Sequence, residues 1–108
     1  MTDKIIVFVT AGKITEAKRI ARRLVEKRLA ACVSVIPKIT SVYTWKNRVE
    51  TQEECLLLIK TRRQRFDELR QCIESLHSYE VPEIIAAPIV EGAANYLNWI
   101  EQVVPAEG

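Results

Sequence analysis

Two long segments of alternating polarity meet at a short polar turn between Ala31 and Thr61, and they constrain the fold more than any other feature. Each arm has about 15 residues and therefore spans roughly 50 Å as a β-strand, at ~3.3 Å per residue. Lys46-Asn47 is the predicted turn of this hairpin, because asparagine tolerates a positive φ. A compact domain of 108 residues has a diameter of only roughly 34 Å. The hairpin is therefore predicted to reach beyond its own domain.

The two arms differ in polarity. Pro37 interrupts the first arm, which predicts a bulge or bend and places this stretch at a sheet edge. The second arm begins with Glu50, Gln52, Glu53 and Glu54, so its first half is predicted to be exposed or paired with another chain. It ends in the apolar run 55–59, which predicts a strand that is buried on both faces.

The remaining segments complete a single domain over residues 1–108. Thr61-Arg62-Arg63-Gln64 matches a capping box that would begin the second helix. The resulting order, β-α-β-β-α-β followed by a terminal helix, predicts an α+β fold of the ferredoxin-like type. Besides the hairpin, strands are predicted over residues 4–10 and 81–90, and helices over 14–28, 66–76 and 93–103.

Composition excludes several classes of function. Sixteen basic residues against 14 acidic ones give a net charge of +2, which is too even for nucleic acid or an anionic membrane to be the main partner. No apolar run approaches the ~20 residues of a membrane span, and no signal peptide is apparent. The three cysteines, Cys32, Cys55 and Cys72, predict free thiols and a cytoplasmic location. Only three glycines occur, which excludes a nucleotide-cradling loop.

The tip of the hairpin favours an oligomer. Tyr43 and Trp45 lie near this tip, beside strand edges that invite pairing with another chain. A closed ring of subunits, in which each hairpin lies on a neighbour, would cover both features.

Several separated motifs, which cover nearly the whole chain, resemble the CutA divalent-cation tolerance family. This resemblance implies a ferredoxin-like protomer in a homotrimer, with hairpins that cross between subunits. It also implies a part in tolerance of copper and other divalent cations, and an architecture similar to that of the PII signalling trimers. The motifs are Arg28-Leu29-Ala30-Ala31-Cys32-Val33, Tyr43-Thr44-Trp45, residues 57–61, residues 77–85, Pro88-Ile89, Gly92 and Tyr96-Leu97-Asn98-Trp99.

The same resemblance implies copper ligands at three positions, a cysteine near the end of the first strand and a pair of histidines. Here Val9 stands at the cysteine position, and Leu76 replaces one histidine, so that His77 alone remains. Ser78 also replaces the usual proline. One imidazole is a poor Cu²⁺ site by itself, so a strong site would need carboxylates, thiols or groups of other subunits. His77 is therefore the candidate metal ligand, for Cu²⁺ or another divalent cation, and no organic cofactor is expected.

A pocket at a subunit boundary is predicted around the loop that follows the second helix. His77, Tyr79, Glu80 and Glu83 cluster there and could hold a metal or a polar ligand. The alternative for His77 is a solvated loop histidine near a helix C-terminus. Tyr43, Trp45 and Lys60 would join this pocket if the hairpin crosses a neighbour, the alternative being interface packing with an exposed lysine.

Other clusters have simpler interpretations. Glu50, Glu53 and Glu54 could bind a hard cation, but a solvated strand edge is the favoured interpretation. The basic residues of the two helices, Lys18, Arg19, Arg22, Arg23, Arg62, Arg63 and Arg65, could grip phosphates but are typical of solvated faces.

No nucleophile and base are recognisable as a pair, and residues 54–60 lack the stacking aromatics of RNA-binding sheets. Together with the CutA resemblance, which implies the trimer and the metal response, these absences predict a non-catalytic, trimeric protein of the divalent metal ion (copper) response. The alternative is a PII-like trimeric signalling or scaffold protein that binds a small ligand at the subunit boundary.

Overall fold

The structure, a computed structural model, describes residues 2–107. A 3₁₀ turn over Arg63–Arg65 joins the third strand to the second helix. The helices are α1 (Ile14–Glu26), α2 (Phe66–Leu76) and α3 (Ala94–Val103), and the strands are β1 (Lys4–Ala11), β2 (Cys32–Trp45), β3 (Arg48–Arg62) and β4 (Ile84–Pro88).

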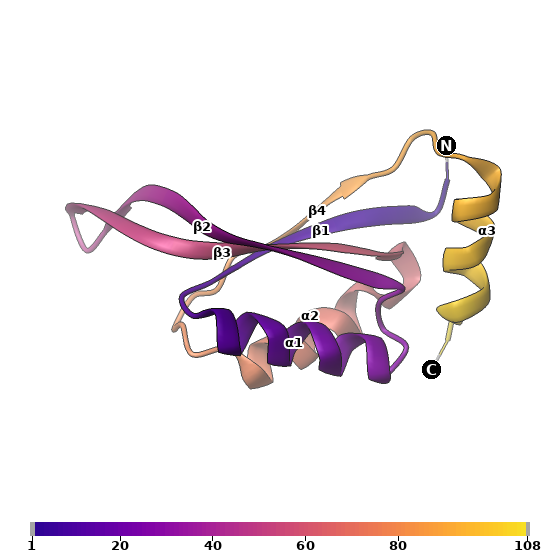
Figure 1. The fold of residues 1–108 in the computed structure, drawn as a ribbon, viewed down its shortest axis with the longest axis horizontal. Helices are drawn as coiled ribbons and strands as arrows, with labels where there is room; N and C mark the ends of the chain where they lie inside the picture. Colours follow the sequence, from indigo (N-terminus) through magenta and orange to yellow (C-terminus); the bar gives the residue numbers. More distant parts are fainter. Residues whose placement is uncertain (1, 108) are drawn as a thin grey trace.

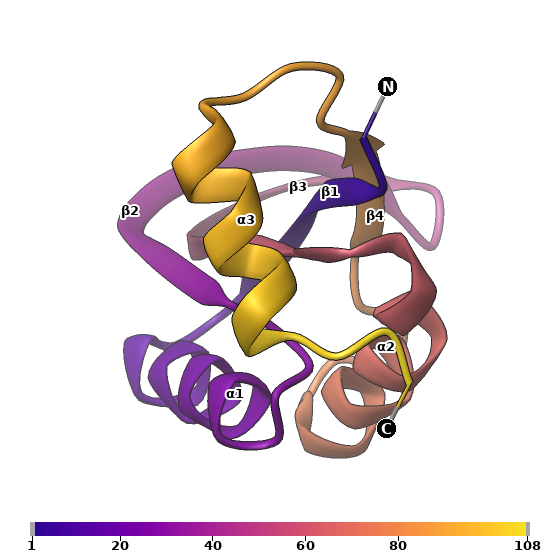
Figure 2. The same cartoon turned by 90° about the vertical axis from the view of Figure 1, so that its right-hand side faces the viewer.

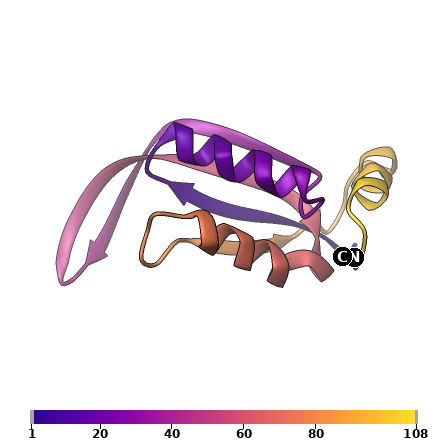
Figure 3. The same cartoon turned by 90° about the horizontal axis from the view of Figure 1, so that it is seen from below.

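The four strands form one antiparallel sheet in the order β2-β3-β1-β4. Helices α1 and α2 lie side by side on one face of this sheet (Figures 1 and 3). This is the arrangement of the ferredoxin-like fold, so the predicted α+β class and the predicted hairpin are confirmed. The observed β2 is an edge strand, as expected for the segment that contains Pro37.

The core lies between the helices and the inner face of the sheet. Strand residues alternate between the two faces, so every second side chain of β1 and β3 points toward the helices. These side chains pack against the apolar stripes of α1 and α2. The fully buried members of this core include Val7, Val9, Leu57 and Ile59 from the strands and Ile20, Leu24, Leu69 and Ile73 from the helices.

The hairpin of β2 and β3 projects beyond the rest of the domain (Figure 1). The molecule measures 43 Å along its longest axis, against 25 and 21 Å along the others. The register shifts between Ile36 and Ile39, with Lys38 at φ 61°, so the predicted bulge at Pro37 is confirmed. Lys46 and Asn47, at φ 51° and 65°, form the two-residue turn, and two positive φ values are typical of the hairpin turn that matches strand twist.

Within residues 2–107, no helix or strand of the same chain covers the outer face of the sheet. Phe8, Leu56 and Leu58 alternate with the core residues, and they are only half-buried. Ile85, which pairs with Phe8 across β1 and β4, is 58% exposed. The prediction that residues 55–59 are buried on both faces is therefore wrong for the isolated protomer, because both helices lie on the same side.

The structure differs from the prediction in the cap of α2, in the bounds of β4 and in the end of α1, which is Glu26 rather than residue 28. Thr61 does not cap α2: its side chain is fully buried and donates a 2.6 Å hydrogen bond to the Leu29 carbonyl oxygen. The helix begins only after the 3₁₀ turn, so the capping-box interpretation is wrong. Strand β4 covers Ile84–Pro88 rather than 81–90, because it pairs with only five residues of β1, Ile5 through Val9.

Helix α3 lies across the end of the sheet that is opposite the hairpin tip (Figure 2). Ile100 and Val104 are fully buried there beside Ala31. Lys4 Nζ, which is almost fully buried, bonds to Glu101 Oε1 at 2.8 Å and fastens the helix to β1. Within residues 2–107, none of the helices has the length and apolar character needed to cross a membrane.

Candidate functional site

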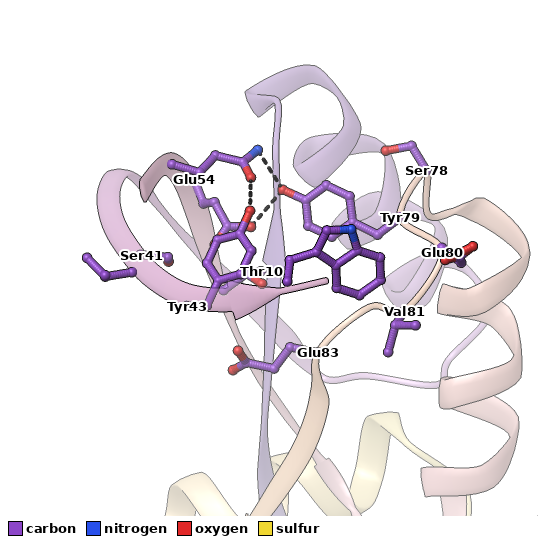
Figure 4. Close-up of a pocket in the computed structure, with 12 residues that line it drawn as sticks. Thr10, Ser41, Tyr43, Glu54, Ser78, Tyr79, Glu80, Val81 and Glu83 are labelled. Carbon is purple, nitrogen blue, oxygen red and sulfur yellow. Dashed lines mark hydrogen bonds between the residues drawn. The ribbon is translucent and has the colours of Figure 1, made fainter. Parts of the chain in front are cut away.

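A pocket of about 680 Å³ lies between the hairpin and the loop that follows α2 (Figure 4). Strands β2 and β3 supply one wall, and residues 78–83 supply the other. This volume falls in the range of ligand sites, roughly 300–1,000 Å³. The lining residues are Thr10, Ser41, Val42, Tyr43, Trp45, Gln52, Glu54, Ser78, Tyr79, Glu80, Val81 and Glu83.

Most residues predicted for the boundary pocket meet in this place. Tyr43, Trp45, Tyr79, Glu80 and Glu83 all line it, within a single protomer.

Lys60 lies elsewhere on the sheet. Its position pairs with Cys32 on one side and with Ile6 on the other. Its Nζ donates to Ser34 Oγ at 2.9 Å and to the Leu58 carbonyl oxygen at 3.2 Å. Lys60 therefore contributes nothing to the pocket of its own chain.

A chain of hydrogen bonds crosses the pocket floor (Figure 4). Its direction follows from Glu54, since an ionised carboxylate only accepts. The Tyr79 hydroxyl donates to Glu54 Oε2 at 2.7 Å and so must accept from Gln52 Nε2, at 3.1 Å. The Gln52 Oε1 atom then accepts from the Tyr43 hydroxyl at 2.7 Å. Both phenol hydrogens are thus used inside the protein. The Tyr43 oxygen keeps its lone pairs for a ligand, whereas the Tyr79 oxygen already accepts from Gln52.

Glu54 is the buried end of this chain, with 6% of its surface exposed. The expectation of a solvated glutamate edge is therefore wrong for Glu54, because the Tyr79 loop covers it. Burial raises the pKa of Tyr79, and the hydrogen bond to Glu54 raises it further. Tyr79 thus stays a neutral donor throughout the physiological pH range.

The His77 side chain is fully buried beside the pocket rather than lining it. Its Nδ1 atom accepts a 3.1 Å hydrogen bond from the Tyr79 backbone N–H, which leaves Nε2 to donate to the Thr10 carbonyl oxygen at 2.7 Å. The rings of His77 and Tyr79 are also in contact, with centroids 4.7 Å apart. The interpretation as a solvated loop histidine is wrong: His77 ties the Tyr79 loop to the end of β1.

Among the lining residues that were not predicted for the pocket, Gln52 and Glu54 belong to the chain of hydrogen bonds. The signal that could have found them is the cross-strand register, in which Ser41 faces Gln52 and Ile39 faces Glu54. Both share a strand parity with Glu50, the partner of Tyr43. The contact to Tyr79 spans 25 positions and has no local signal.

Comparison with known proteins assigns the family. Residues 5–103 match the model of the CutA1 divalent ion tolerance protein family. The chain belongs to this family.

Relatives agree with this assignment. The chain is 50% identical to a protein CutA homolog of Xenopus laevis over 91% of its own length, and it spans 65% of the frog protein. A solved structure of the divalent cation tolerance protein of Thermus thermophilus superposes with a TM-score of 0.92, at 42% identity, covering 94% of this chain and 98% of that one. A structure described as the periplasmic divalent cation tolerance protein CutA of Archaeoglobus fulgidus superposes with a TM-score of 0.90 at 40% identity. The match covers 93% of this chain and 97% of that one.

The metal ligands that the CutA1 family suggested do not fit this protomer. Both nitrogens of His77 already bond to main-chain groups, so the ring offers no free lone pair. Val9 is fully buried in the core. Within residues 2–107, no group of three or more histidine, cysteine, aspartate or glutamate side chains is placed to hold a metal ion. All three cysteines have free thiols.

Proposed function

We propose that this CutA1-family chain acts as a non-catalytic homotrimer in the tolerance of divalent metal ions, copper among them, and that it binds a ligand in the Tyr43–Tyr79 pocket at a subunit boundary. The names of the family and its relatives describe divalent-ion tolerance and name no reaction. The observation that supports a trimer is the uncovered outer face of the sheet, together with the hairpin that projects beyond it.

Apolar side chains that are exposed on this face and on the hairpin favour a chain that does not stay alone in water. Ile85 on the outer face is 58% exposed. Near the hairpin tip, Val49 and Val42 are 76% and 66% exposed, on the face of the hairpin that continues the helix-facing side of the sheet. Contiguous exposed apolar patches on soluble proteins mark interfaces. A ring of three chains lets each hairpin cover the outer face of a neighbour and closes without free edges.

Light scattering behind size exclusion tests the assembly. The chain has a mass of 12.4 kDa, so the proposal predicts a particle of three times that mass. A monomer at micromolar concentration would contradict the trimer.

Direct binding of a divalent cation, as part of this proposal, needs donors from more than one subunit. The pocket supplies carboxylates from Glu54, Glu80 and Glu83, but they do not form a closed ligand set within one chain. Carboxylate oxygens with additional groups from a neighbour would suit a divalent cation better than the engaged imidazole of His77.

Calorimetry with Cu²⁺ in chelator-free buffer near pH 7 tests this part. The proposal predicts saturable binding that weakens in Glu80→Gln and Glu83→Gln and persists in Glu53→Gln, an exposed carboxylate outside the pocket lining. Heat no larger than that of the buffer control would contradict direct binding while leaving the assembly untouched.

The pocket also favours a second candidate, a PII-like signalling or scaffold trimer that responds to a small ligand. The two candidates differ in what fills the pocket, a metal ion or an organic molecule. The cytoplasmic location predicted from the free cysteines is part of our proposal. Cellular fractionation tests it, and a periplasmic fraction would contradict it.

A further inference from the structure

The pocket has a charge opposite to that of the chain. The protein carries a net charge of +2. The pocket lining, however, contains three glutamates, Glu54, Glu80 and Glu83, and no lysine, arginine or histidine, so its formal charge is −3. Such a lining repels phosphates and carboxylates and attracts cations.

Hydrogen-bonding capacity points the same way. The hydroxyl hydrogens of Tyr43 and Tyr79 are used within the pocket floor, which leaves the Tyr43 oxygen as an acceptor, while the Tyr79 oxygen already accepts from Gln52. Glu54 is almost fully buried, with 6% of its surface exposed, and its Oε2 already accepts the hydrogen bond from Tyr79. No hydrogen bond to its Oε1 forms among residues 2–107, and this oxygen is not one of the buried atoms that lack a partner, so it is left for solvent or a ligand. A ligand with N–H donors satisfies it.

The aromatic side chains add a preference for an organic cation over a bare metal ion. Trp45, Tyr43 and Tyr79 line the pocket together. An ammonium group already approaches one of these rings, since Lys46 Nζ lies 5.8 Å from the Trp45 ring centroid. Aromatic faces hold such cations through the ring quadrupole, and they also pack against an attached apolar group.

We propose that the pocket binds a small organic ammonium, whose N–H donors reach Glu54 and whose apolar skeleton lies against Tyr43, Trp45 and Tyr79. This deepens the pocket part of the proposed function, and it does not depend on the trimer. The positive charge of the ligand and its number of N–H donors together determine which ligands the pocket selects. A neutral isostere loses the attraction of three carboxylates, and a quaternary ammonium loses the hydrogen bond to Glu54.

Trp45 reports binding once the other tryptophan is removed. In a Trp99→Phe background, Trp45 is the sole tryptophan, and Trp99 does not line the pocket. Phenethylammonium, titrated at about 0.15 M salt, is expected to change the Trp45 fluorescence saturably. 2-Phenylethanol and 3-phenylpropanoate are the neutral and anionic probes of similar shape, and each is expected to bind at least tenfold more weakly.

Two variants locate the charge that matters. Glu54→Gln is expected to weaken phenethylammonium at least tenfold, while Glu53→Gln, the adjacent exposed carboxylate on β3 that is absent from the lining, leaves it unchanged. Should Glu54→Gln unfold, Glu83→Gln on the opposite wall replaces it, with an expected loss of about threefold. Equal binding of the alcohol, tighter binding of the anion, or no saturable change would overturn the proposal. Because particle mass is measured separately, a failed titration leaves the trimer standing, and a monomer that binds the ammonium refutes only the trimer.

Discussion

The hydroxyl of Tyr79 donates a 2.7 Å hydrogen bond to Oε2 of Glu54, and this contact joins the loop after α2 to the middle of the hairpin. Glu54 is almost fully buried, so its carboxylate depends on such donors to satisfy its hydrogen bonds. The bond therefore shapes the pocket wall and stabilises the fold at the same time.

Removal of the Tyr79 hydroxyl is expected to destabilise the protein. Tyr79→Phe leaves the buried Glu54 carboxylate and the Gln52 amide without their partner. Loss of a hydrogen bond to a charged, buried group costs about 1.5–3 kcal/mol. Urea unfolding at one fixed protein concentration measures the difference.

Tyr43→Phe is the matched control, because Tyr43 lies at the exposed end of the same chain of bonds. It should lower the free energy of unfolding by less than about 1 kcal/mol. Equal losses in both variants would contradict the assignment of Glu54 as the buried end.

Tyr79 also predicts a decline of stability at alkaline pH. Its pKa is raised above the ordinary value of 10.0 in the folded protein, first by burial and then by the bond to Glu54. The unfolded chain loses this proton near pH 10 while the folded chain keeps it, so unfolding is favoured as the pH rises above 10. Unfolding free energies at pH 9 and pH 11 should differ less in Tyr79→Phe than in the wild type. An identical pH dependence in both would refute the prediction.

The sequence predicted the fold well, because its signals are local and periodic. The alternating polarity of the hairpin arms, the Lys46-Asn47 turn and the disruption at Pro37 each depend on neighbouring residues. The capping box over 61–64 failed because burial of Thr61 against Leu29, a contact 32 positions away, overrides its local pattern.

The site was predicted only in part, for the same reason. Tyr43, Trp45, Tyr79, Glu80 and Glu83 could be gathered from the hairpin tip and one loop. The hydrogen bonds of His77 could not be predicted, because the Thr10 carbonyl group lies 67 positions away in the sequence and belongs to the main chain.

His77 should therefore matter for loop position. His77→Ala removes a fully buried ring and leaves the Thr10 carbonyl and the Tyr79 N–H unpaired. The combined cavity and hydrogen-bond loss is expected to cost about 2–4 kcal/mol. Thermal unfolding measures it, with Ser78→Ala as the control on the same loop, where the exposed bond to Glu16 predicts a loss below about 1 kcal/mol. A His77→Ala variant as stable as Ser78→Ala would show that the ring is dispensable.

The uncovered face of the sheet gives a direct test of assembly. Ile85→Glu introduces a charge on this face, which the proposed trimer buries, and an unpaired buried charge is strongly unfavourable. We expect the particle to fall from three chains to one in light scattering. Val25→Glu on α1, where the valine is 43% exposed, makes the same chemical change away from the outer face and should leave the mass unchanged. Dissociation by both variants, or by neither, would contradict an interface on this face.

The lowered pKa of Asp3 predicts how the stability of the fold changes in acid. Burial alone would raise the pKa of its carboxyl, but hydrogen bonds from Lys4, Gln64 and Arg62 outweigh burial and lower the pKa from 3.8 to about 2. The folded state thus holds this proton less tightly than the unfolded state, and the stabilisation is present above pH 4 and disappears as the pH falls toward 2. Asp3→Asn should cost about 2 kcal/mol at pH 7 and almost nothing at pH 2. Urea unfolding at both pH values measures the gap, with Glu53→Gln, an exposed carboxylate, as the control that should show none. A gap of constant size at the two pH values would mean that Asp3 acts through packing and not through its charge.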